Sequence, residues 1–101
     1  MGESAEEFSR KLAKEALLKA LGKQADLQFS AIRMHGWEMP GIGKGYGFTG
    51  IVTITSKSGT HRAVRFMAAP GGAGTEDQMS ASDFDALCSV YCPGAGTPSN
   101  F

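Results

Sequence analysis

The stretch YGFTGIVTIT, residues 46–55, decides the fold that this sequence predicts. Most of its bulky apolar side chains stand at even-numbered positions, whereas the odd-numbered positions carry Gly, Thr and one Ile. Alternation with period two is typical of a β-strand that has one buried face. Exposing Val52 and Ile54 would cost about 1.5–3 kcal/mol each. We therefore expect the even-numbered side chains, Tyr46 and Phe48 included, to face the core.

Strands on both sides of this stretch predict an antiparallel meander. Residues 56–59 (SKSG) have the composition of a hairpin turn, and residues 61–68 have that of the returning strand. Upstream, residues 27–31 alternate as a half-buried strand does, and the phase of the alternation shifts at Ile32 and Met34. A β-bulge would produce such a shift.

A helix is predicted on each side of the meander. Ser4 and Glu7 form a capping box at the start of the first helix, and a glycine ends it. Its expected core-facing stripe consists of Ala5, Phe8, Leu12, Ala16 and Ala20, widened by Leu17 and Leu21. Ser80 or Ser82 caps the second helix, and Pro93 ends it. The apolar side chains of that helix recur at helical spacing at Phe84, Leu87, Cys88 and Tyr91.

The element order predicts an α+β fold. An N-terminal helix, an antiparallel meander of three or four strands and a C-terminal helix would form a two-layer sandwich, with the helices covering one face of the sheet. A chain of 101 residues suits one domain. We expect residues 1–93 to form this domain and residues 94–101 to be a flexible C-terminal tail, because they are rich in small and polar residues.

Composition excludes several classes of function. Ten basic and ten acidic residues give a net charge of zero, although residues 26–69 carry five basic and two acidic residues, a local net charge of +3. The length excludes a kinase or a complete dinucleotide-dependent enzyme. No apolar run is long enough to span a membrane, and no signal peptide is recognisable. A cytoplasmic location is expected, provided that Met1 is the natural start, because a processed export signal would leave no trace.

Residues 44–50 (KGYGFTG) carry two short resemblances. The run resembles the RNA-contacting strand of RNA recognition motifs and a similar run in cold-shock domains, which implies single-stranded nucleic-acid binding by stacking on Tyr46, Phe48 and Trp37. Lys44, Arg62 and Arg65 would then contact phosphates. The glycine spacing is also similar to the loop that kinases fold over ATP phosphates, but here a strand follows it. Because the alternation buries Tyr46 and Phe48, nucleic-acid binding is the second hypothesis and not the first.

Residues 36–45 are predicted to form a long loop, with Trp37 and Met39 among its glycines. Such a loop either folds back on the core or presents an anchor to a partner, and Trp and Met are favoured at the centres of interfaces. The leading hypothesis is a small non-enzymatic module that binds another protein, or its own copy, through this loop and the open face of the sheet. Bacterial and phage accessory proteins often have this size. The candidate contact residues are Trp37, Met39, Lys44, Arg62 and Arg65.

A metal or hydrolytic site is the third hypothesis. Cys88 and Cys92 lie four residues apart on the second predicted helix, where they are expected to be buried thiols. A disulfide between them would strain a regular helix unless Pro93 unwinds the last turn. The zinc pattern that these cysteines form with His35 and His61 is weak, and no nucleophile-elbow motif supports a hydrolytic triad at His61. We therefore predict no catalytic residue, no metal ligand and no cofactor.

Overall fold

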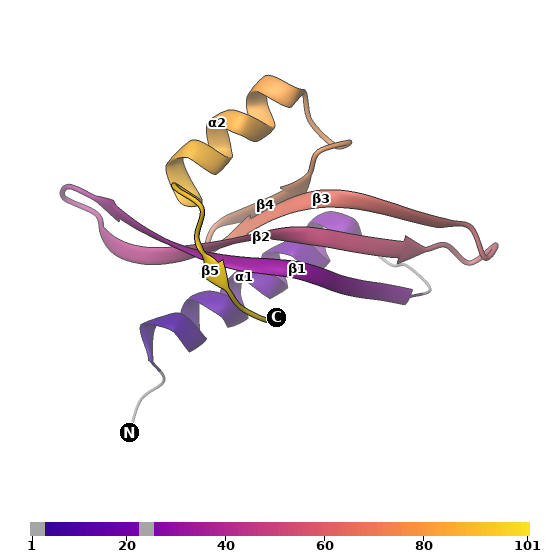
Figure 1. The fold of residues 1–101 in the computed structure, drawn as a ribbon, viewed down its shortest axis with the longest axis horizontal. Helices are drawn as coiled ribbons and strands as arrows, with labels where there is room; N and C mark the ends of the chain where they lie inside the picture. The colour runs from indigo at the N-terminus through magenta and orange to yellow at the C-terminus, as the bar shows by residue number, and fades with distance from the viewer. Residues whose placement is uncertain (1–3, 23–25) are drawn as a thin grey trace.

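The computed structural model describes residues 4–22 and 26–101. It contains two helices and one five-stranded antiparallel sheet, in the strand order β4-β3-β2-β1-β5 (Figure 1). The elements are α1 (Ala5–Leu21), β1 (Asp26–Met39), β2 (Gly43–Thr55), β3 (His61–Ala69), β4 (Gly72–Thr75), α2 (Ala81–Tyr91) and β5 (Thr97–Pro98). The α+β class and the order helix, meander, helix are confirmed. Among the described residues, neither helix is long and apolar enough to cross a bilayer.

The central strand faces the way that its alternation predicts. Phe48 and Val52 in β2 are fully buried, and Ile54 is 4% exposed. They form the main core with residues of α1 and β3. The neighbouring strand β1 keeps this core face through a register shift between Ser30 and Arg33, where Ala31 has a φ of 53°. The predicted bulge is therefore confirmed, and it explains why the β1 positions that face the main core change from odd numbers to even numbers.

Residues 36–45 are not a loop, so that prediction is wrong. β1 and β2 remain paired as far as Met39 opposite Gly43, and they form a long two-stranded arm that projects from the sheet (Figure 1). The glycines make this possible. A side chain at Gly45 would collide with the indole of Trp37, since a Cβ there would lie 2.8 Å from Trp37 Cε2. We call residues 36–46 the arm from here on.

Helix α1 packs against the sheet through two small side chains and two leucines. Its buried residues are Ser9, Ala13, Leu17 and Leu21, so the predicted stripe is correct only at the two leucines. Phe8, expected in the core, is 55% exposed. Small side chains at positions 9 and 13 let the helix approach the sheet, whose own aromatic rings fill the space between the two layers.

The two helices lie on opposite faces of the sheet, so the prediction that both cover one face in a two-layer sandwich is wrong. Helix α1 packs on the face that carries Phe48, whereas Phe84 of α2 packs with Met67 on the other face. Thr49 and Met67 are paired across β2 and β3, so both point toward α2. The helix covers only part of this face (Figure 1). The face therefore presents one covered and one open region.

The chain after Pro93 packs against the sheet, although its composition predicts a flexible tail. Strand β5 pairs with β1 opposite Arg33 and Met34. The ring of Phe101 lies 5.4 Å, between centroids, from each of the rings of Phe29, Phe48 and Phe66. A terminal aromatic residue that covers the end of an apolar core keeps this segment in place by the same burial that holds the strands.

Candidate functional site

The structure divides the predicted contact residues into two groups. Trp37, Met39 and Lys44 lie on the arm, whereas Arg62 and Arg65 lie on β3. Lys44 faces Glu38 across the arm, with Nζ 4.0 Å from Oε2. The five predicted contact residues therefore do not form one continuous surface.

Both arginines of β3 are paired with carboxylates that follow β4. Arg62 forms an ion pair with Asp77, and Arg65 Nε lies 2.9 Å from Glu76 Oε2. The hydrogen bond between the side chains of Arg65 and Glu76 raises the pKa of Arg65 and lowers the pKa of Glu76. The local positive charge predicted for residues 26–69 is thus partly neutralised by the acidic segment that comes next in the sequence.

Trp37 joins the arm to α2. Its indole meets the ring of Tyr91 edge to face, with centroids 6.0 Å apart and an interplanar angle of 84°. The indole Nε1 is buried, and no hydrogen-bond acceptor within residues 4–22 and 26–101 reaches it. An unsatisfied buried donor costs about 1–3 kcal/mol, so the indole is not in its most favourable polar environment.

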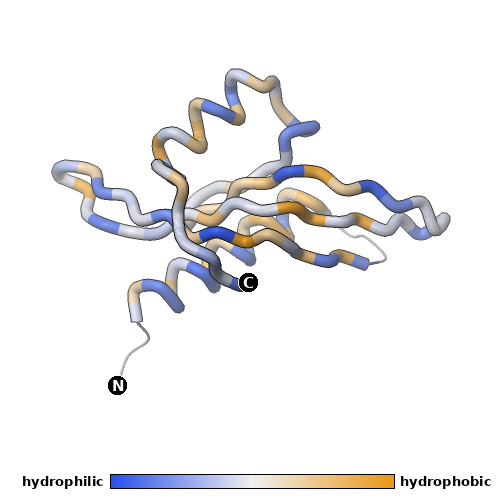
Figure 2. The backbone as a smooth tube through the Cα atoms, in the orientation of Figure 1, coloured by the Kyte–Doolittle hydropathy of each residue, from blue (hydrophilic) through white to orange (hydrophobic). Residues whose placement is uncertain are grey.

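Exposed apolar side chains are present on both of the elements that this contact joins. On the arm, Ile42 at the tip is 75% exposed. On α2, Leu87 and Val90 are 37% and 47% exposed; Leu87 lies one turn before Tyr91, and Val90 lies one turn after Leu87. Figure 2 shows hydrophobic residues along the central strands and in the C-terminal half of α2. We call this set the apolar strip; its members are Met39, Ile42, Trp37, Tyr91, Val90 and Leu87.

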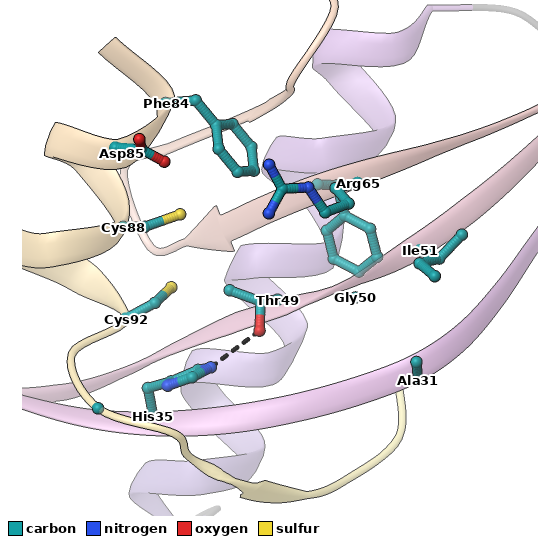
Figure 3. A pocket seen from close by; sticks show the side chains of 12 residues that line it. Ala31, His35, Thr49, Gly50, Ile51, Arg65, Phe84, Asp85, Cys88 and Cys92 are labelled. Carbon is teal, nitrogen blue, oxygen red and sulfur yellow. Dashed lines mark hydrogen bonds between the residues drawn. The ribbon is translucent and has the colours of Figure 1, made fainter. Parts of the chain in front are cut away.

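A cavity of about 390 Å³ lies between α2 and the sheet, next to the apolar strip (Figure 3). The sheet contributes Thr49, Ile51 and Arg65 to its walls, and α2 contributes Phe84 and Asp85. The guanidinium carbon of Arg65 lies 5.4 Å from the centroid of the Phe84 ring. This cation–π contact and the Glu76 ion pair hold Arg65 at the rim of the cavity.

No protein-family model, no curated protein and no solved structure matches this chain. Its own surface is therefore the basis for any functional assignment. Two features of that surface stand out: the apolar strip, and the cavity beside it.

His35 closes one end of the cavity and is 5% exposed. Its Nδ1 lies 3.2 Å from the carbonyl oxygen of Pro93, and its Nε2 lies 2.8 Å from Thr49 Oγ1 (Figure 3). Because a carbonyl only accepts, Nδ1 carries a hydrogen; in the neutral ring, Nε2 then accepts from the Thr49 hydroxyl. His35 thus connects the central strand to the turn after α2.

The same turn is held by a second side chain of β1. Arg33 donates from Nε to the carbonyl of Ala95 at 2.6 Å, and from its guanidinium NH2 group to the carbonyl of Gly96 at 3.0 Å. The sequence reading considered His35 only as a metal ligand and missed this role. The available signal was positional, because residues 33 and 35 share a strand face once the bulge reverses the alternation.

The two cysteines face the cavity from its α2 side (Figure 3). Burial raises the pKa of Cys92 to about 12, and its Sγ lies 3.6 Å from the carbonyl oxygen of Phe48. Burial and the nearby Asp85 raise the pKa of Cys88. His61 does not line this cavity; its Nδ1 lies 2.8 Å from Thr55 Oγ1 on the exposed part of the sheet. Among the described residues, no three metal-binding side chains are grouped to hold an ion.

Replacing His35 with alanine is expected to lower the free energy of unfolding by about 2–3 kcal/mol. The variant would lose both hydrogen bonds, leave the Thr49 hydroxyl without its partner and open a void beneath Gly96. Urea denaturation monitored by circular dichroism measures the change. The matched control is His61→Ala, which removes an exposed imidazole and should change stability by less than about 0.5 kcal/mol. Equal effects of the two substitutions would contradict the role assigned to His35.

Proposed function

We propose that this chain is a non-enzymatic module that binds another protein on the apolar strip. The observation that supports the proposal most is the edge-to-face contact of Trp37 with Tyr91. It joins two separate elements, each of which carries exposed apolar side chains. The arm alone would offer a narrow ribbon, and α2 alone would offer two side chains.

The residue types of the strip suit an interface. Trp, Tyr and Met are enriched at the centres of protein–protein contacts, and Trp and Tyr bury much area there while losing little rotamer freedom. Covering Ile42 alone, now 75% exposed, would contribute about 1–2 kcal/mol.

The open region of the sheet face is a weaker candidate for the contact. Beyond α2 it carries Ile51, which is 36% exposed, with threonines on either side of it along β2. Its surface is mostly polar, and Arg65 there is already paired. We therefore place the centre of the contact on the strip and the open face at its rim. By analogy of size and composition, the chain suits a cytoplasmic accessory protein of bacterial or phage origin.

Nucleic-acid stacking has less support. The ring of Phe48 is fully buried, and the guanidinium carbon of Arg10 lies 5.7 Å from its centroid. Tyr46 is half-buried against the main core. A stacking platform needs bare rings flanked by free cations, whereas Arg62 and Arg65 have carboxylate partners.

The proposal predicts that strip variants lose protein binding while the fold persists. Purified protein with an N-terminal tag would be immobilised and used to capture proteins from a cell extract, with Trp37→Ala and Ile42→Ser compared against the parent. Captured proteins would be quantified by mass spectrometry. We expect both variants to retain less than about a tenth of the signal of any specific partner, because each removes a large apolar side chain of the strip.

The matched control is Phe8→Ser, which removes a 55% exposed aromatic residue from α1, far from the strip in the sequence. It should capture the same proteins as the parent. Light scattering over a range of concentrations tests whether a second copy is the partner. Capture that is the same for Trp37→Ala, Ile42→Ser and the parent would contradict the proposal.

A further inference from the structure

Cys88 and Cys92 lie one helical turn apart at the end of α2, and both sulfur atoms point into the cavity (Figure 3). In a regular helix the Cα atoms of residues i and i+4 are about 6 Å apart, within the range that a disulfide can bridge but near its upper limit. A regular backbone would hold the two Cβ atoms too far apart. The pair can therefore be bridged only where the helix opens.

The helix does open at this point. Cys92 is the C-cap residue, with φ −133° and ψ 52°, and its N–H still donates to the carbonyl of Cys88. Pro93 follows and has no N–H to continue the helical pattern. Cys92 is thus connected to the last turn by one hydrogen bond, while its own backbone has already left the helical conformation. A backbone rotation at Cys92 changes the direction of its side chain and leaves the preceding residues of α2 helical.

We propose that Cys88 and Cys92 are a redox-active pair that forms an intramolecular disulfide by exchange with a small-molecule disulfide such as oxidised glutathione. This inference is independent of the proposed binding function. The reaction begins when Cys88, deprotonated to its thiolate, attacks one sulfur of the disulfide and releases one glutathione thiolate. Cys92, deprotonated in turn, attacks the mixed disulfide on Cys88 and releases the second. Two protein thiols are oxidised, one glutathione disulfide is reduced, and two protons leave the protein for the two glutathione thiols.

Burial sets the order of the two attacks. Cys88 is half-buried, whereas Cys92 is 5% exposed and held toward the carbonyl of Phe48. An external disulfide reaches Cys88 first, and Cys92 is positioned to resolve the adduct. The cavity beside the pair gives the leaving group space at its mouth.

The charges around the pair predict how the rate depends on pH. Asp85 on α2 raises the pKa of Cys88, Arg65 on β3 lowers it, and desolvation raises the pKa of both thiols. His35 on β1 uses both ring nitrogens in hydrogen bonds to Pro93 and Thr49. The thiolate fraction below the pKa rises tenfold per pH unit, so exchange should accelerate by about tenfold per unit between pH 7 and pH 9.

The test incubates the folded protein with oxidised glutathione and follows intact mass and free thiols over time. We expect the parent to lose both thiols and the mass of two hydrogen atoms. Cys92→Ser should instead accumulate the mass of one glutathione on Cys88, because nothing resolves the adduct. Cys88→Ser should react at least about tenfold more slowly than Cys92→Ser, because its remaining thiol is buried.

Two results would overturn the proposal. One is a parent protein that stops at a stable glutathione adduct, which would mean that Cys92 cannot reach Cys88. The other is loss of both thiols only in urea, which would show that the folded helix prevents the bridge. Circular dichroism of both serine variants before the reaction establishes that they are folded, and phenylarsine oxide, which bridges neighbouring dithiols, provides a second measure of the sulfur spacing in the parent.

Discussion

Replacing Phe48 with alanine is expected to lower the free energy of unfolding by about 3–5 kcal/mol, the largest effect of any single substitution considered for this chain. The ring is fully buried and lies between α1 and the C-terminal Phe101, whose ring centroid is 5.4 Å away. Its loss removes apolar burial and leaves a void beside Phe101 that rigid strands cannot close. Urea denaturation at two or more wavelengths measures the change.

The matched control for this prediction is Ile51→Ala in the same strand. Ile51 is 36% exposed on the opposite face, so its truncation should cost less than about 1 kcal/mol. If Phe48→Ala were no more destabilising than Ile51→Ala, the ring would not be core, and the resemblance of residues 44–50 to an RNA-binding strand would gain weight.

Replacing Gly47 with valine is expected to separate the end of α2 from the sheet. A Cβ at this position would collide with the carbonyl oxygen of Tyr91 and lie 2.8 Å from Cys92 Sγ. Both neighbours belong to the segment that caps α2, and the opposing atom is backbone, which cannot rotate away. We expect a loss of about 3 kcal/mol in stability, since overpacking of a close contact forces the backbone to shift.

The same substitution should expose the buried thiol. If opening of α2 becomes easier by about 3 kcal/mol, labelling of Cys92 by an aromatic disulfide should accelerate roughly a hundredfold, because each 1.4 kcal/mol corresponds to a factor of ten. Gly72→Ala is the matched control, since Gly72 lies in a strand, has no positive φ and has no atom within 4 Å of an added Cβ. Unchanged labelling in Gly47→Val would mean that α2 does not pack on β2 as described.

The sequence predicts the central strand and the bulge because both follow from one rule, the alternation of buried and exposed side chains. Phe48, Val52 and Ile54 show the buried face directly, and the phase shift at Ile32 locates the bulge. The capping residue Ser4 likewise fixes the start of α1, where its hydroxyl accepts from the N–H of Glu7 at 3.2 Å.

The features that sequence reasoning missed depend on contacts between distant segments. The glycines of the arm, Gly45 among them, predict a loop from the sequence alone. Only the structure shows that Gly45 makes room for the indole of Trp37. Which side of α1 is buried depends on the space that the sheet leaves. Ala13 fits into that space and is fully buried, whereas the larger Phe8 is exposed. Phe101 and His35 acquire their roles only when the chain end returns to β1.

The candidate contact surface, too, could be predicted from the sequence only in part. Trp37 and Met39 were identifiable as interface types from their sequence, but their connection to Tyr91, Val90 and Leu87 was not, because it requires α2 to lie beside the arm. Conversely, the sequence presents Arg62 and Arg65 as free cations for a partner, because it does not show their ion pairs with Asp77 and Glu76.

Strand β2 keeps the Phe48 ring inside, and we propose that recognition takes place on the apolar strip instead. Hydroxyl-radical footprinting of the folded protein tests it most directly, because it reports solvent access at single side chains. With intrinsic reactivities taken into account, we expect Phe48 to be protected and Ile42 and Val90 to be modified rapidly. Modification of Phe48 at a rate comparable to that of Ile42 would contradict the claim.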